Sequence, residues 1–388
     1  MTFKAEVSQS ALSRAGCPKC NSELQIESRR CICSNCSDRW EIRDGIPRFF
    51  NPGYYWGEVP EPEAMALLDE ARSLGWRDAV EQRFKGSAPL QYSILNWQSR
   101  ASWLPLLGLR AGAVALDVGS GYGAITHALA VSCAEVYSLE AIPLRIEFSR
   151  IRLRQEGLSN VHLMQASATQ LPIRDNSFDL IVINGVLEWV GQWDTSASPE
   201  AVQLGLLQKL YRALKPEGIL LIGIENRFGY NFFAGGRDHS GLPYTGLMPR
   251  WLASLVLRHS KRPPHRTELN ARHQYRTYTY SELGYRRILR KAGFRYLTFY
   301  AAEPGYNEPV SLVPLRRNAL TAHILRMMSE PDLGSRRRWR RLAKLYMSRL
   351  GLFRAFIPDF VIIANKDSSH AHSKQFVVLV PGSSPVAE

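Results

Sequence analysis

The sequence predicts an α/β protein in which helices cover both faces of a doubly wound, largely parallel sheet. The first observation is that short apolar β-type runs alternate with amphipathic helical stretches between residues 114 and 224. The second is a glycine-rich turn at residues 119–123, placed where a strand passes into a helix. Parallel strands joined by helices require right-handed crossovers, which leaves few topologies to consider.

Seven strands are expected in order along the chain. They are predicted at residues 114–118, 135–140, 161–164, 178–184, 219–224, 295–301 and 360–364. Helices are predicted from the glycine turn to residue 131 and at residues 143–156, 200–214 and 281–292. The last of these has Ser281 as its N-cap and Gly293 just after its end.

The overall composition is that of a globular chain. Of the 388 residues, 45% are hydrophobic and 22% are charged, which argues against disorder, collagen-like repeats or a coiled-coil rod. No apolar run approaches the roughly 18 residues of a spanning helix, and residues 1–10 lack the shape of a signal peptide. We therefore expect a cytoplasmic protein with no transmembrane segment.

Five of the six cysteines lie within residues 17–36. Cys17 and Cys20 form one C-x2-C knuckle, and Cys33 and Cys36 form a second. Four thiolates can close a tetrahedral zinc site that stabilises a module too small to bury a core. Disulfides are disfavoured in a chain without a secretory signal, and Cys31 is either a spare cysteine or a substitute for Cys33. Because a closed site of four thiolates has no open position, its predicted role is structural.

These signals divide the chain into six regions. They are a zinc ribbon at residues 1–50, a helical connection at 51–110, a core at 111–303, a basic helical insertion at 304–358, a last core strand at 359–366, and a tail at 367–388 that we expect to be poorly ordered. Within the core, residues 226–280 form an unusually long loop, and such loops are usually functional.

Positive charge is concentrated in one part of the sequence. The net charge is +14, and residues 251–350 alone hold 21 Lys and Arg against 6 Asp and Glu. Such a block suggests an anionic partner: RNA, a phosphate-bearing or glycan-linked small molecule, or an acidic membrane surface contacted peripherally. The alternative is a solvated basic helix.

Acidic residues accompany the glycine turn. Asp117 comes just before the glycines, and Glu140 ends the next strand, where a carboxylate can accept hydrogen bonds from both ribose hydroxyls. The glycine motif alone would also suit a dinucleotide, and Asp117 could simply cap the helix turn.

With these residues in place, the chain resembles the class I S-adenosylmethionine-dependent methyltransferases over residues 112–226. The resemblance continues through residues 166–172, 175–181, 185–190 and 213–218. It implies a seven-stranded Rossmann-like methyltransferase sheet with S-adenosylmethionine as cofactor. The zinc ribbon at the N-terminus, with zinc as a structural ion, and the helical or irregular insertions predicted above are additions to this sheet.

The resemblance also implies the cofactor contacts. The methionine part is expected against Asp117 and the glycine turn, the ribose at Glu140, the adenine at Ser167 and Ala168, and the methyl group near Asn184; the turn residues are Gly119, Ser120, Gly121 and Gly123. Ser167 stands where the family commonly has Asp, and its hydroxyl can accept a hydrogen bond without carrying a charge.

The residues expected to contact the methyl acceptor are 225–243, which follow the fifth predicted strand. Asp238 beside His239 is interpreted as an orienting carboxylate and a general base. The alternative is a structural or substrate-binding histidine. A base is needed only if the acceptor must lose a proton, because methyl transfer from a sulfonium is chiefly a matter of alignment.

Two further resemblances bear on the acceptor. The cysteine knuckles with residues 40–47 resemble the zinc ribbon of tRNA-methyltransferase activators. Residues 225–243 and 303–309 resemble methyltransferases of bacterial surface-polysaccharide and sugar biosynthesis. The predicted function is methyl transfer to a hydroxyl or similar group of a sugar or sugar-linked metabolite. The alternatives are methylation of tRNA or rRNA, and a scaffold that binds cofactor or a partner without catalysis.

Overall fold

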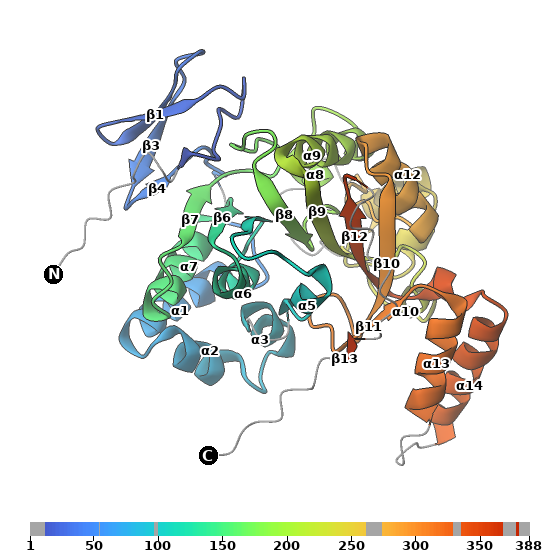
Figure 1. The fold of residues 1–388 in the computed structure, drawn as a ribbon. Helices are drawn as coiled ribbons and strands as arrows, with labels where there is room; N and C mark the ends of the chain where they lie inside the picture. Colours follow the sequence, from blue (N-terminus) through green and yellow to red (C-terminus); the bar gives the residue numbers. More distant parts are fainter. Residues whose placement is uncertain are drawn as a thin grey trace. The chain divides into compact units, whose positions relative to one another are not determined.

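The computed structural model describes residues 12–53, 55–96, 100–260, 274–328, 335–367 and 378–379 (Figure 1). The chain divides into two compact units. The first comprises Met1–Val186 with Gly205–Leu220, and the second comprises Leu187–Leu204 with Leu221–Glu388. Among the described helices, none has the length and apolar character needed to cross a bilayer.

The first unit opens with a small antiparallel sheet. Its strands follow one another in the order β1 (Leu24–Glu27), β2 (Arg30–Cys33), β3 (Arg39–Arg43) and β4 (Ile46–Pro47). Few large side chains are buried here, and Trp40 packs on Phe49 with ring centroids 5.3 Å apart. The amide of Phe49 donates to the carbonyl of Gln165 at 2.8 Å, which ties this sheet to the main one.

Helices then lead into the main sheet. They are α1 (Glu61–Ser73), α2 (Trp76–Phe84), α3 (Pro89–Leu95) and α5 (Leu104–Leu107). The apolar faces of the first three share a buried cluster with Phe148 of α7 (Pro143–Gln155). The fully buried Arg152 on α7 lies 3.9 Å from the ring centroid of Trp76 and donates to the carbonyls of Tyr122 and Leu95.

The main sheet of the first unit has the strand order β9-β8-β5-β6-β7. These strands are β5 (Val114–Val118), β6 (Glu135–Glu140), β7 (Val161–Gln165), β8 (Phe178–Asn184) and β9 (Leu214–Glu225). β5 pairs in parallel with β6 and β8, and β6 pairs in parallel with β7. Every residue of β5 is buried, as expected for a strand in the middle of a covered parallel sheet. α6 (Ala124–Ser132) and α7 are the crossover connections, and α9 (Pro199–Ala213) leads into β9.

The second unit contains the strand order β13-β11-β10-β12-β9. β10 (Tyr296–Glu303) runs antiparallel to β12 (Asp359–Asn365) and to β11 (Ser311–Pro314), which pairs with β13 (Val378–Leu379). All seven predicted strands are present, but the count of seven was wrong because β11 and β13 extend the sheet. Most of the tail at 367–388 lies outside the described residues.

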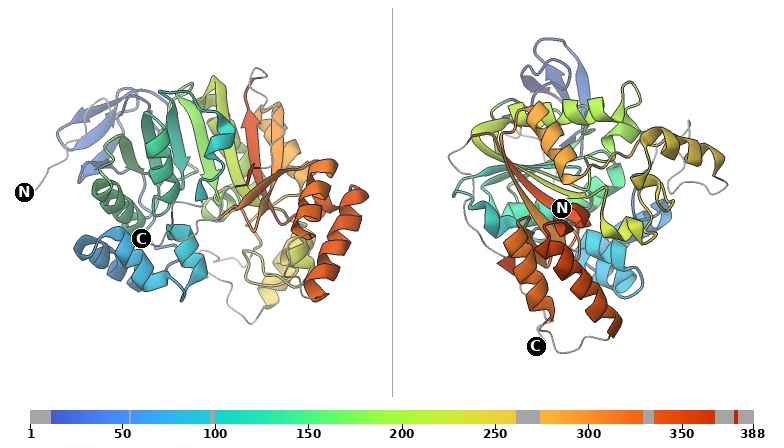
Figure 2. Two further views of the ribbon diagram at one scale, coloured as in Figure 1. Left: turned by 60° about the horizontal axis from the view of Figure 1, so that its bottom comes forward. Right: turned by 90° about the vertical axis from the view of Figure 1, so that its right-hand side faces the viewer.

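Helices of the second unit are α8 (Val190–Trp193), α10 (Tyr230–Phe233), α11 (Arg250–His259), α12 (Glu282–Ala292), α13 (Arg317–Met328) and α14 (Ser335–Arg349). The predicted limits of α12 are confirmed: Ser281 Oγ accepts from Gly284 N at 3.3 Å, and Gly293 has a φ of 116°. The basic insertion contains the hairpin of α13 and α14 (Figure 2). The basic residues at 261–273 lie outside the described residues.

Candidate functional site

The glycine turn between β5 and α6 is open at its centre. Gly119, Gly121 and Gly123 have φ values of 70°, 57° and 76°, a left-handed conformation that favours glycine. A Cβ on Gly119 would lie 2.6 Å from Val186, and one on Gly123 would lie 2.7 Å from Ser149, whereas a Cβ on Gly121 would meet nothing within 4 Å. The turn is therefore packed at its two ends and leaves room for a ligand in the middle.

Glu140 is held in place beside this turn. Its Oε2 accepts from the amide of Gly121 at 2.8 Å, and its Oε1 accepts from the amides of Ala141 and Ile142 at 2.9 Å. Nη1 of Arg145 lies 3.8 Å from Oε2. Arg145 itself is buried, and it also pairs with Glu58. The carboxylate that is expected to bind ribose is thus positioned by backbone donors and one buried cation.

Asp117 lies one residue before the end of β5 and is 2% exposed. Its Oδ2 accepts from Thr126 Oγ1 at 2.6 Å, and a hydroxyl chain continues through Ser138 to Ser120 at 3.0 and 2.8 Å. Burial raises the pKa of Asp117 to about 6, against the opposing hydrogen bond from Thr126. The network couples the predicted cofactor carboxylate to the glycine turn.

The remaining predicted cofactor residues differ in whether their polar side-chain atoms already have hydrogen-bond partners. Ser167 is buried, and its hydroxyl already accepts from the amide of Thr169 at 3.2 Å and contacts the Thr169 hydroxyl at 2.9 Å. Ala168 is buried beside it. Asn184, the last residue of β8, is 8% exposed, and neither polar atom of its side chain has a hydrogen-bond partner in the described part of the chain. A buried amide without partners is costly, so Asn184 is well placed to receive a ligand.

His239 lies within the second unit between two carboxylates. Its Nε2 is 3.1 Å from Glu225 Oε2 and 3.8 Å from Glu188 Oε1. Glu225 is the last residue of β9, and Glu188 comes four residues after β8. Trp189 packs on the imidazole with ring centroids 4.5 Å apart. Tyr306 donates its hydroxyl to Glu225 Oε1 at 3.1 Å.

The charges of His239 and its neighbouring carboxylates stabilise one another. Burial disfavours a charged imidazole, but Glu225 and Glu188 outweigh it and raise the pKa of His239 to about 9. Burial also acts against ionised Glu225, but His239 lowers the pKa of this carboxyl below its usual value. Burial and the charge of Glu225 raise the pKa of Asp359 well above its usual range. At neutral pH the group therefore contains an imidazolium at His239 that faces Glu225, whose pKa is held below its usual value.

Asp238 contacts a different set of side chains. Its carboxylate accepts from the amide and hydroxyl of Ser240 at 2.8 and 2.6 Å, from Thr245 at 2.9 Å and from Tyr275 at 2.9 Å. No hydrogen bond among the described residues joins it to His239. The carboxylates nearest the imidazole are Glu225, which the sequence interpretation included only as part of the acceptor segment 225–243, and Glu188, to which it gave no role. Their positions at and just after strand ends could have indicated them, because such ends border ligand sites in open α/β sheets. The base role of His239 stays a prediction.

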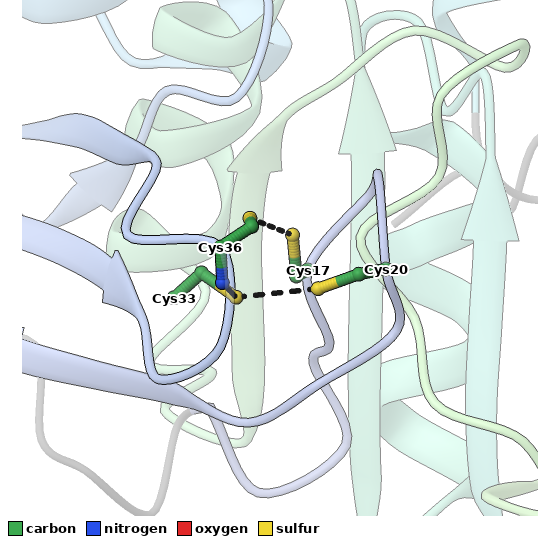
Figure 3. A group of neighbouring side chains, drawn as sticks. All are labelled: Cys17, Cys20, Cys33 and Cys36. Atoms are coloured by element: carbon green, nitrogen blue, oxygen red, sulfur yellow. Dashed lines mark hydrogen bonds between the residues drawn. The ribbon is translucent and has the colours of Figure 1, made fainter.

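The four knuckle cysteines come together in the N-terminal sheet (Figure 3). Their sulfur atoms all lie within 4.8 Å of one another, with Cys17 to Cys36 at 3.6 Å and Cys20 to Cys33 at 3.4 Å. Bonds of about 2.3 Å to a tetrahedral zinc ion would place the sulfur atoms about 3.8 Å apart. The amides of Asn35 and Cys36 each donate to Cys33 Sγ at 3.4 Å.

Cys31 lies outside this cluster, which favours its interpretation as a spare cysteine. It is buried on β2, and burial raises the pKa of its thiol to about 12. All six cysteines of the chain are free.

Comparison with known proteins identifies the central part of the chain. The methyltransferase domain family matches residues 116–222. The demethylmenaquinone methyltransferase of Geobacillus stearothermophilus is 29% identical over 134 residues, covering 33% of this chain and 53% of the relative. The ubiquinone/menaquinone biosynthesis C-methyltransferase UbiE of Vibrio cholerae is 34% identical over 119 residues, covering 30% and 42%. The chain thus spans about half or less of the length of these relatives.

Solved structures show similarity at low sequence identity. Phosphoethanolamine N-methyltransferase 2 of Haemonchus contortus, in complex with S-adenosyl-L-methionine, has a TM-score of 0.41 and 17% identity, covering 77% of this chain and 59% of that one. The [4+2]-cyclase SpnF has a TM-score of 0.42 and 16% identity, covering 83% and 98%. The family match and the strand order confirm the predicted fold class, and the predicted enzyme class is confirmed for the domain at residues 116–222.

Proposed function

We propose that this protein transfers a methyl group from S-adenosylmethionine to a small acceptor. The observation that carries the proposal is the group formed by the open glycine turn, the fixed carboxylate of Glu140 and the unpartnered amide of Asn184, all within the segment that matches the methyltransferase family. In this proposal Asp117 and the turn bind the methionine part, Glu140 the ribose, Ser167 and Ala168 border the adenine, and Asn184 lies near the methyl group.

Calorimetric titration with S-adenosylmethionine tests cofactor binding. Glu140→Ala should weaken binding by about tenfold or more, because a hydrogen bond to a charged group contributes roughly 1.5–3 kcal/mol. Glu81→Gln is the matched control, since Glu81 lies on the surface of α2 in an exposed ion pair with Lys85. Absence of binding by the unmodified protein would refute the methyltransferase proposal and favour the scaffold alternative.

For the acceptor, we propose a hydroxyl or similar group of a sugar or sugar-linked metabolite. Support comes from the second unit, where His239, Glu225 and Tyr306 can exchange hydrogen bonds with several hydroxyls. Glu188 and Glu225 would accept from acceptor hydroxyls, and the imidazolium of His239 would keep Glu225 ionised. Because the pKa of His239 is raised to about 9, His239 would remove a proton only where it is first deprotonated. The two relatives named above are a demethylmenaquinone methyltransferase and a ubiquinone/menaquinone biosynthesis C-methyltransferase, and each match covers about a third of this chain.

The acceptor class can be tested with labelled S-adenosylmethionine and cell extract, with and without prior ribonuclease treatment. We expect the label to appear in a small-molecule fraction and to survive ribonuclease treatment. Label that is lost with the RNA would support the alternative of tRNA or rRNA methylation, for which the basic block at residues 251–350 is the supporting feature. The six free cysteines suit a reducing compartment, so we place the reaction in the cytoplasm.

We also propose that Cys17, Cys20, Cys33 and Cys36 bind one structural zinc ion. The sulfur separations and the amide donors to Cys33 support this proposal, because such donors stabilise thiolate ligands. Elemental analysis should find zinc in the purified protein and its loss in Cys20→Ser. Cys31→Ser should retain the metal, and loss of zinc from both variants would contradict this ligand set.

A further inference from the structure

Large apolar side chains form an exposed stripe along α14. The stripe consists of Trp339, Leu342, Tyr346 and Leu350, which are 75%, 39%, 67% and 55% exposed. Their spacing of three, four and four residues places them on one side of a helix. The last of them continues the helical turn, since the amide of Leu350 donates to the carbonyl of Tyr346.

The opposite side of α14 already has its packing partner. Leu345 and Ser348 are 8% and 1% exposed, and the hydroxyl of Ser348 contacts that of Thr321 on α13 at 2.8 Å. Arg341 donates to the carbonyl of Met327 at the end of α13. The hairpin is visible in both views of Figure 2. The stripe is therefore not needed to hold α14 against α13, and its exposure costs free energy unless another surface covers it.

The charge of α14 indicates what that surface is. The helix sequence SRRRWRRLAKLYMSR contains seven Lys and Arg and no acidic residue. Arg349 is exposed and lies three residues after Tyr346, so it borders the stripe. A helix that combines many basic residues with exposed Trp, Tyr and Leu side chains is typical of helices that lie in the plane of a membrane surface.

We propose that α14 lies flat on an anionic lipid surface, with the stripe inserted at the boundary between headgroups and acyl chains. A lipid surface would cover all four stripe residues. Single-stranded RNA could stack on Trp339 and Tyr346, but it would leave Leu342 and Leu350 exposed, because aliphatic side chains offer no stacking platform for bases. The proposal goes beyond the methyl-transfer proposal and does not depend on it.

Vesicle flotation of the full chain tests this docking surface. The unmodified protein should float with vesicles of phosphatidylcholine and phosphatidylglycerol and remain in solution with phosphatidylcholine alone. The double variant W339A/Y346A should partition about tenfold less, since loss of inserted apolar surface worth about 1.4 kcal/mol changes an equilibrium tenfold. Trp251→Ala is the matched control, because Trp251 on α11 is 70% exposed and lies outside the stripe.

Each result separates the candidates. Unchanged partitioning of W339A/Y346A would show attraction by charge alone and overturn the inserted stripe. Absence of flotation at low salt, combined with binding of single-stranded RNA that the same variant loses, would overturn the lipid proposal in favour of a nucleic acid. Circular dichroism of the variant controls for folding, and none of these measurements requires methyl transfer.

Discussion

At the scale of single residues, two carboxylates of the candidate sites differ in the groups that hold them. Glu140 takes three amide donors before any ligand binds, and Glu225 is kept ionised by His239. The two differ in their partners: Glu140 depends mainly on rigid backbone, whereas Glu225 depends on a side chain that titrates. Mutation should therefore affect them differently.

Arg145→Gln should destabilise the first unit strongly. Removing the guanidinium leaves Glu58 and Glu140 without their buried cation, and breaking a buried ion pair in this way costs about 3–5 kcal/mol. Urea denaturation measures the free energy of unfolding. Arg150→Gln is the control, because Arg150 on the same helix pairs with Glu147 in a more exposed position and should cost less than about 1 kcal/mol. Similar losses in both variants would argue against the special role of Arg145.

His239 should make stability depend on pH. The folded-state pKa of about 9 lies above the ordinary value of 6.5, so the folded state binds the proton more tightly. The contribution of His239 to the free energy of unfolding is therefore fully present below pH 6.5 and is lost as the pH rises through 9. The unfolding free energy of the unmodified protein should fall over this interval, and His239→Gln should remove that part of the slope. His259→Gln, on the surface of α11, should leave the slope unchanged. Superimposable curves for all three proteins would contradict the assignment.

At the scale of secondary-structure elements, predictions that depend on residues close together in the sequence were more accurate than predictions that depend on distant contacts. The limits of α12 depend on a cap and a terminal glycine within a few residues, and both were predicted. β9 was expected to begin at residue 219, yet it begins at Leu214, although Pro216 and Gly218 weaken strands. The carbonyls of Arg212 and Ala213 accept from residues 176 and 177 just before β8, so tertiary pairing aligns this segment despite its local preference.

The elements and site residues that were missed share a dependence on distant partners. β11 and β13 have four and two residues, too few to show a periodic pattern. The knuckles and the glycine turn are local motifs and could be predicted. His239 pairs with Glu225, which is 14 residues away, and lies near Glu188, which is 51 residues away, so neither contact follows from adjacent positions in the sequence. The sequence interpretation therefore chose Asp238, the neighbour of His239 in the sequence, as the orienting carboxylate.

Removal of the proposed zinc ion should loosen the N-terminal sheet selectively. This sheet has few large buried side chains, and its thiolates would repel one another without a cation. After treatment with a chelator, hydrogen exchange should accelerate in β1 to β3 and change little in β5, which is buried along its whole length. Cys31→Ser protein with its metal in place is the control. Equal acceleration of hydrogen exchange in both sheets would show that the N-terminal sheet and the core unfold together.

At the scale of the whole molecule, the two compact units carry different sets of predicted functional residues. The residues assigned to the cofactor belong to the first unit, and the His239 group and α14 belong to the second. β9 begins in one unit and ends in the other. Binding of a cofactor and binding of an acceptor should therefore protect different parts of the chain against hydrogen exchange.

S-adenosylhomocysteine should protect the first unit against hydrogen exchange. At a concentration about 100 times its Kd, a ligand stabilises the folded state by about 2.7 kcal/mol. The slowing should centre on β5, the glycine turn and the end of β6 at Glu140. α14 serves as the internal control and should exchange at an unchanged rate. Protection confined to the second unit would contradict the assigned cofactor residues.

The two cysteines outside the four-cysteine cluster can report on transient opening of the structure around them. Cys31 is buried in the N-terminal sheet, and Cys133 is buried at the end of α6, where burial raises the pKa of its thiol to about 11. A protonated, shielded thiol reacts with an alkylating reagent only when the structure around it opens. The rates at which these two sulfur atoms are labelled, followed by mass spectrometry on unmodified protein, would therefore measure the opening of the N-terminal sheet and of the core separately.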